Sequence, residues 1–177
     1  HSQATSPRVL HLATHGFFFP DPDSDEATGD QVSKFKQSDH PMIRSGLILS
    51  GANQGWLMTS PNIDREDGVL TAFEISQLNL TNTELVVLSA CETGLGDIQG
   101  SEGVFGLQRA FKMAGARYLI MSLWQVPDFQ TQDLMVTFYT KWLEEGKPIP
   151  EAFRLAQVEM REKYMNPYFW AGFVLME

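Results

Sequence analysis

The chain has 177 residues, of which 43% are hydrophobic, a size and composition typical of one folded domain with a substantial core. Thirteen basic and twenty-two acidic residues give a net charge of −9, which disfavours nucleic acid and anionic membranes as partners, because both require clustered Lys and Arg. No apolar run reaches the ~18 residues of a membrane-spanning helix, and no secretory signal opens the chain.

The first half of the chain predicts short strands around a long polar segment. Residues 8–14 (RVLHLAT) form an apolar run that predicts a buried strand. Residues 20–41 contain five acids between Asp21 and Asp30 and several prolines, and predict an acidic, flexible loop. Residues 46–59 predict two short strands around a Gly-Ala-Asn-Gln-Gly turn.

The second half alternates apolar runs with helical patterns. Thr71 and Glu74 have the spacing of a capping box, which predicts a short helix with Thr71 as its N-cap. The runs at 83–90, 117–124 and 171–175 predict strands, and residues 91–103 form a glycine-rich loop. Amphipathic helices are expected at 104–116, 130–145 and 150–164, with Gly115 and Gly146 ending the first two and Pro150 opening the third.

This order of elements predicts an α/β domain with a mainly parallel sheet and helices on both faces. We expect residues 8–177 to form one domain, without internal repeats. Because the chain opens on His1 and reaches a strand by Arg8, we expect part of the fold to lie upstream of it.

Two chemically active side chains follow apolar strands. His15 and Cys91 each come after such a run, and each opens a glycine-containing segment. In a parallel sheet, functional groups gather beyond the carboxyl ends of the strands. If the two strands are neighbours, a thiol and an imidazole meet there, which is the arrangement that a thiolate nucleophile and its base require.

The adjacent glycine supports this interpretation. Gly16 allows a sharp backbone turn and leaves its N–H unshielded, so the N–H groups of Gly16 and Cys91 could form an oxyanion hole. Such a site requires neither a cofactor nor a metal. A single cysteine cannot form an internal disulfide, which favours a reducing, cytoplasmic compartment.

Other interpretations of the same residues stay open. A cysteine at a strand end is often a small buried hydrophobic residue, and a histidine there is often part of the core. His11, His15 and Cys91 could also supply three metal ligands, although strand alternation would bury His11 deep in the sheet. The glycine-rich loop lacks the ending of a phosphate-binding loop, and no serine lies in a G-x-S-x-G elbow.

Several segments together resemble a known family. HLATHG, VLSACETGLG, GVFGLQRAF, GARYLIMSLWQV and FWAGFVL stand in the order and spacing of CHAT domains, and DGVLTAFEI is similar to the segment before the cysteine strand. CHAT domains are caspase-like modules, related to caspases and separases, that often follow tetratricopeptide repeats in bacteria. The resemblance extends from about residue 8 to residue 175.

The resemblance implies a caspase-haemoglobinase fold and a cysteine peptidase that cleaves a protein substrate. His15 matches the catalytic histidine, Cys91 the nucleophile and Gly16 the oxyanion glycine. Caspase-like folds have further strands before the histidine strand, so this chain resembles the C-terminal part of the domain. An exposed strand could then pair with a second copy. The alternative is a non-cleaving or partner-activated interaction module, regulated by an upstream repeat region.

Two acidic residues are candidates for substrate selection. Asp97 and Asp128 lie in loops after the cysteine strand and the strand that follows it. An acidic pocket there would favour Arg or Lys in the substrate. Alternatively, Asp128 caps the helix that begins near Phe129, and Asp97 is a solvated loop residue. We expect the three consecutive phenylalanines after Gly16 to pack beneath the acidic loop or to line a pocket.

Overall fold

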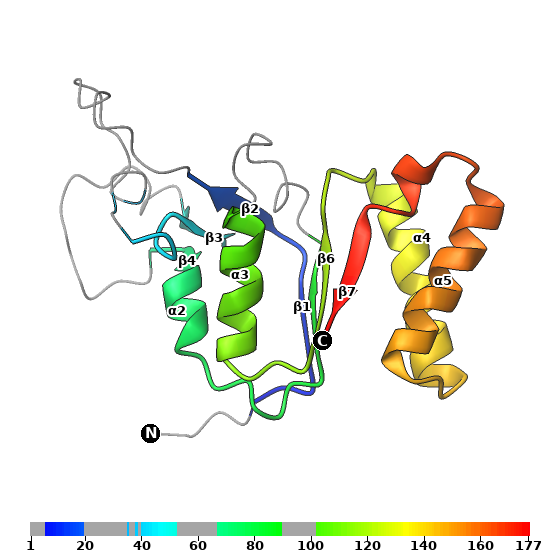
Figure 1. Cartoon of the computed structure of the whole chain (residues 1–177), viewed down its shortest axis with the longest axis horizontal. Coiled ribbons are helices and arrows are strands. Elements are labelled where there is room, and N and C mark those ends of the chain that lie inside the picture. The colour runs from blue at the N-terminus through cyan, green and yellow to red at the C-terminus, as the bar shows by residue number, and fades with distance from the viewer. Residues whose placement is uncertain (1–5, 20–34, 36–37, 39, 53–66, 90–101) are drawn as a thin grey trace.

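The computed structural model of the chain describes residues 6–19, 35, 38, 40–52, 67–89 and 102–177 (Figure 1). Its strands are β1 (Val9–Leu12), β2 (His15–Phe18), β3 (Ser45–Ile48), β4 (Val69–Thr71), β5 (Leu85–Leu88), β6 (Tyr118–Ser122) and β7 (Phe173–Met176). Its helices are α2 (Ala72–Ser76), α3 (Glu102–Met113), α4 (Asp128–Tyr139) and α5 (Ile149–Lys163). A π-helical turn, η1 (Thr140–Glu144), continues α4, and a 3₁₀ turn, η2 (Pro167–Phe169), precedes β7.

The central sheet of the described chain has the strand order β1-β5-β6-β7. β1, β5 and β6 are parallel, and β7 pairs antiparallel with β6. Every residue of β5 and β6 is buried, as expected for strands that are covered on both faces. The predicted α/β class with a mostly parallel sheet is therefore confirmed.

Helices cover the two faces of this sheet (Figure 1). Strand alternation sends Leu85 and Val87 into a core with α4 and α5, which includes Phe138 and Trp142. The intervening residue, Val86, enters the other core, beside α2 and α3. Each continuous apolar run in the sequence thus contributes side chains to two separate cores, one on each face of the sheet.

A small antiparallel sheet, in the order β2-β3-β4, lies beyond the carboxyl end of β1. Phe17 from this sheet contacts the rings of Phe19 and Phe35, and Phe35 is buried. Phe35 belongs to the segment predicted as an acidic loop, so Phe17, the first of the three consecutive phenylalanines, packs against a part of that segment. Most of residues 20–41 lie outside the described residues, as do residues 90–101 and the second strand predicted within 46–59.

Local sequence signals account for the ends of several helices. Thr71 Oγ1 accepts a hydrogen bond from Glu74 N–H at 3.2 Å, and Glu74 Oε2 accepts one from Thr71 N–H at 2.8 Å. The predicted capping box at α2 is therefore confirmed. Gly115 follows α3 with a φ of +102°, a left-handed conformation that favours glycine.

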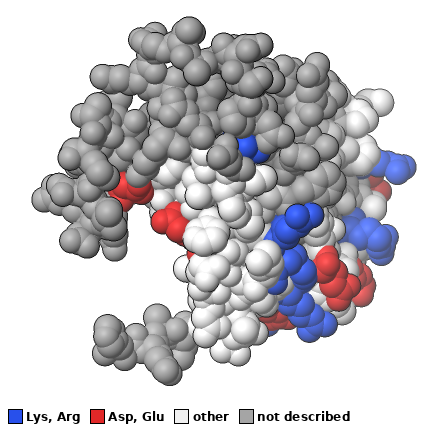
Figure 2. Space-filling model, turned by 60° about the vertical axis from the view of Figure 1, so that its left-hand side comes forward, with Lys and Arg blue, Asp and Glu red and all other residues white. Residues whose placement is uncertain are grey.

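The surface of the described part carries mixed charge on the face drawn in Figure 2. There, Lys and Arg side chains lie beside Asp and Glu side chains. This mixture does not concentrate the positive charge that polyanion binding requires. Within the described ranges, no helix combines the length and apolarity needed to cross a membrane.

Candidate catalytic site

The two strands that lead to His15 and Cys91 are neighbours. β1 and β5 pair in parallel with Leu12 opposite Leu88, and Ser89 N–H donates to Leu12 O at 3.1 Å. His15 and Cys91 each lie three positions beyond this last pair, so both segments leave the sheet at the same edge. The condition that the two strands be neighbours is therefore met, whereas Cys91 itself lies outside the described residues.

His15 lies in a different structural position from the one predicted. The strand predicted at 8–14 ends at Leu12, and His15 begins β2, whose partner is β3. The chain changes sheet at Thr14, where the hydroxyl donates to the carbonyl of Ile48. The His15 side chain is exposed at this junction between the two sheets.

Gly16 is buried in β2, at the edge of the small sheet. Phe19 N–H donates to Arg44 O at 2.8 Å, which sets the alternation of hydrogen-bonded and non-bonded pairs between β2 and β3. On this alternation Gly16 and Leu47 form a non-bonded pair. The N–H of Gly16 is therefore directed away from β3, toward the side of β2 that has no partner among the described strands.

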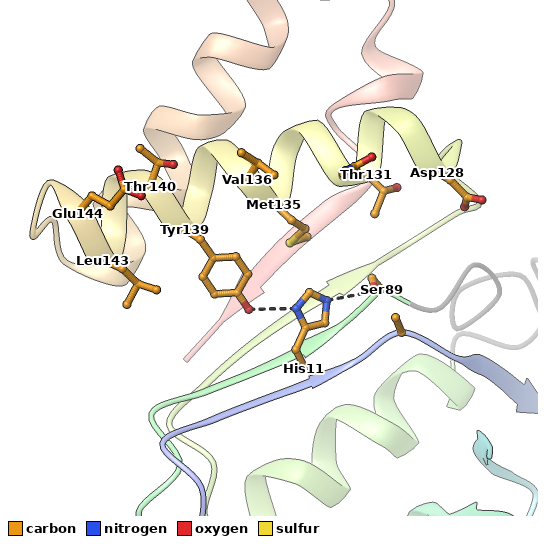
Figure 3. A pocket seen from close by; sticks show the side chains of 12 residues that line it. His11, Ser89, Asp128, Thr131, Met135, Val136, Tyr139, Thr140, Leu143 and Glu144 are labelled. Carbon is orange, nitrogen blue, oxygen red and sulfur yellow. Dashed lines mark hydrogen bonds between the residues drawn. The ribbon is translucent and has the colours of Figure 1, made fainter. Parts of the chain in front are cut away.

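His11 lies in β1 and points toward α4 rather than into the interior of the sheet (Figure 3). Its Nδ1 lies 3.1 Å from the Tyr139 hydroxyl, and its Nε2 lies 3.2 Å from Ser89 Oγ. Desolvation lowers the pKa of His11 below its ordinary value of 6.5. The expectation that His11 would be deeply buried is wrong, because β1 is the outermost strand of the described sheet and its α4 face borders a pocket.

This pocket has a volume of about 580 Å³ and lies between the carboxyl-end half of β1, the residue after β5, and α4 with η1 (Figure 3). Its polar groups include the linked side chains of Ser89, His11 and Tyr139. Leu143 of η1 also lines the pocket and is 57% exposed.

Asp128 lies at one end of this pocket (Figure 3). It is the first residue of α4, while Pro127 is the N-cap, and no side chain makes a capping hydrogen bond there. The alternative in which Asp128 caps a helix beginning near Phe129 is therefore wrong. Asp97 lies outside the described residues.

The described residues do not support a metal centre. Among them, no three side chains of His, Cys, Asp or Glu come together as a candidate metal site. His11 and His15 lie in strands of different sheets, and the ring nitrogens of His11 contact Tyr139 and Ser89. The third ligand of the proposed set, Cys91, is outside the described part.

Sequence reasoning missed two residues of this region. One is Tyr139: Met135, Tyr139 and Leu143 are spaced by four residues, which places them on one helix face. Ser89 lies two residues before Cys91, where strand alternation directs it to the same face as Val87, toward α4. Both spacings were available in the sequence.

Comparison with known proteins gives consistent matches. The family model described as CHAT domain matches residues 1–177. Human tetratricopeptide repeat protein 28 is 32% identical over 186 residues, which cover 99% of this chain and 7% of that protein. Mouse tetratricopeptide repeat protein 28 is 32% identical over 111 residues, covering 61% of this chain and 4% of its own length. The chain therefore spans a small part of these curated relatives.

Proposed function

Because the chain belongs to the CHAT domain family, a caspase-like family, we propose that it is a cysteine endopeptidase whose dyad is Cys91 and His15. The proposal includes a caspase-haemoglobinase fold. The observation that carries it is the pairing of β1 with β5. The two strands end side by side, with Leu12 opposite Leu88, and His15 and Cys91 each follow three residues after this last pair in the sequence.

In the proposed mechanism, His15 accepts the thiol proton of Cys91, and the thiolate attacks the scissile carbonyl carbon. The N–H groups of Gly16 and Cys91 stabilise the oxyanion of the tetrahedral intermediate. Collapse of this intermediate breaks the C–N bond, and His15 gives its proton to the leaving amine. Water, with His15 as base, then hydrolyses the acyl-thioester and restores the thiol. The exposed position of His15 and the outward N–H of Gly16 are compatible with these roles.

A second candidate function is a non-cleaving or partner-activated interaction module. It is favoured by β1, whose outer edge is unpaired among the described strands and could receive a strand from a second copy or from an upstream repeat region. We place either function in the cytoplasm, since the chain has a single cysteine.

Alkylation of Cys91 tests the dyad directly, because the chain contains one cysteine. An imidazole beside the thiol should make iodoacetamide react at Cys91 at a pH well below the ordinary thiol pKa. We expect His15→Ala to slow this reaction at pH 6, whereas a control substitution at another exposed histidine, His40→Ala, should leave the rate unchanged. Equal rates in all three proteins would contradict the pairing of His15 with Cys91.

Cleavage of a denatured peptide library, read by mass spectrometry, distinguishes the peptidase from the module. The peptidase produces new termini with the wild-type protein and with His40→Ala, and none with Cys91→Ala or His15→Ala. Binding of a protein partner without any Cys91-dependent cleavage would favour the interaction module.

A further inference from the structure

We infer that the pocket beside His11 receives the substrate side chain that precedes the scissile bond, and that it selects Arg or Lys. This inference rests on the proposed peptidase function. Its first support is position. Ala13 and Ser89 line the pocket and lie two residues before His15 and Cys91, respectively. The pocket therefore begins where the two segments that carry the proposed dyad leave the sheet (Figure 3).

The second support is the charge of the lining. Among the described residues that line the pocket, the charged side chains are Asp128 and Glu144, which lie at its opposite ends and are both acidic. Neither carboxylate forms an ion pair with a residue in the described part of the chain. His11 adds no competing positive charge near neutral pH, because its pKa is lowered. A cationic side chain is favoured in such a pocket, whereas a carboxylate would meet two like charges.

The third support is the character of the walls. Met135, Val136 and Leu143 line the pocket between its acidic ends, and the Tyr139 ring lies beside them. Arg and Lys combine an aliphatic stem with a charged head, so the stem contacts apolar walls while the head reaches a carboxylate. Asp128 is the nearer partner for that head, because it follows the carboxyl end of β6, at the same edge of the sheet as Ser89. Asp97, outside the described residues, is not needed for this arrangement.

Cleavage of matched peptides tests the selectivity. Four fluorogenic peptides should differ only in the residue before the cut, which is Arg, Lys, Leu or Asp. We expect kcat/KM to be highest for Arg and Lys, and Asp128→Asn to lower the Arg-to-Leu ratio by about tenfold, the value of one charge-assisted hydrogen bond. The control is Glu151→Gln, which removes an acidic charge from the first turn of α5, away from the pocket, and should leave the ratio unchanged. Cys91-dependent cleavage with an equal Arg-to-Leu ratio in wild type and Asp128→Asn would overturn the inference.

A binding experiment separates this inference from the dyad. Cys91→Ala is titrated with acetyl-Ala-Ala-Arg-amide and with acetyl-Ala-Ala-Asp-amide, while amide and ring signals are followed by NMR. The Arg peptide should shift signals of Ser89, His11 and Tyr139, and Asp128→Asn in the same background should weaken that binding. The Asp peptide should leave these signals unchanged.

The two experiments fail in different ways. If no peptide is cleaved by the wild-type protein but the Arg peptide binds at these residues, the peptidase proposal fails and the preference of the pocket for a basic side chain stands. If cleavage depends on Cys91 but the Arg peptide shifts only residues elsewhere, the pocket is not the specificity site. Equal binding of the Arg and Asp peptides would likewise overturn the inference.

Discussion

The hydrogen bond between Tyr139 and His11 joins α4 to β1, and we expect its removal to lower the stability of the fold. The Tyr139 hydroxyl lies 3.1 Å from His11 Nδ1, and the two ring centroids are 5.9 Å apart. Tyr139→Phe removes the hydroxyl but keeps the ring, which also packs on Phe138 and Trp142. The substitution therefore isolates the hydrogen bond from the aromatic packing.

The expected cost follows from the partial exposure of the pair. A hydrogen bond in a folded protein contributes about 0.5–1.5 kcal/mol net. His11 is partly exposed at the pocket, so water can replace the lost partner, and the cost should fall in the lower half of that range, about 0.5–1 kcal/mol. For a domain of this size, that free energy corresponds to a decrease in Tm of roughly 1–4 °C.

Urea unfolding monitored by fluorescence measures this cost, and Tyr118→Phe provides the matched control. The Tyr118 hydroxyl forms no hydrogen bond with a side chain or backbone group of the described chain, so its removal should change the free energy of unfolding by less than about 0.5 kcal/mol. A double-mutant cycle with His11→Ala should give a coupling energy of about 0.5–1 kcal/mol. Equal effects of the two Tyr substitutions, or zero coupling, would refute the link between α4 and β1.

Three further predictions concern pH and the small sheet. The pKa of His11 is lowered in the folded protein, so its contribution to stability is complete above its ordinary pKa of 6.5 and is lost as the pH falls through the lower folded value. Between pH 7.5 and pH 5, the free energy of unfolding should therefore decrease less in His11→Gln than in the wild-type protein. An equal decrease in both proteins would contradict this. Thr71→Ala removes the α2 capping box and should cost about 1 kcal/mol in chemical unfolding, while Thr71→Ser should cost clearly less; equal costs would exclude the hydroxyl as the cause. Gly46→Ala should destabilise the protein by about 1–3 kcal/mol, because a Cβ there would lie 2.5 Å from the Leu70 carbonyl oxygen; a neutral effect on Tm would show that β3 can move away from β4.

The sequence predicted those elements whose environment is uniform. β5 and β6 are buried on both faces, and a continuous apolar run is the direct signature of that environment. The capping box at Thr71 and the left-handed Gly115 depend on the backbone within a few residues, so their spacing alone identified them. These features needed no knowledge of distant contacts.

The predictions from sequence were wrong where the structure depends on contacts with residues far away in the chain. Residues 8–14 look like one strand, but the chain leaves β5 after Leu12 and pairs with β3 from His15 onward, and β3 lies thirty residues away. His11 looked buried because its neighbours are apolar, although β1 is an edge strand whose one face opens to a pocket. Neither fact can be obtained from local periodicity.

The register of β1 against β5 links these observations to the proposed chemistry. With Leu12 opposite Leu88, the alternation of β1 places Leu10 and Leu12 in the core beside α3, and leaves His11 on the face of α4. A slip of one residue would move His11 into the apolar core and displace the His15 segment by about 3.3 Å relative to the cysteine segment. The hydrophobic pattern of β1 therefore excludes that slip, and the His11–Tyr139 contact forms only in the correct register. Since a displacement of about 1 Å is enough to impair a nucleophile and its base, the same alternation that builds the two cores also sets the geometry on which the proposed dyad depends.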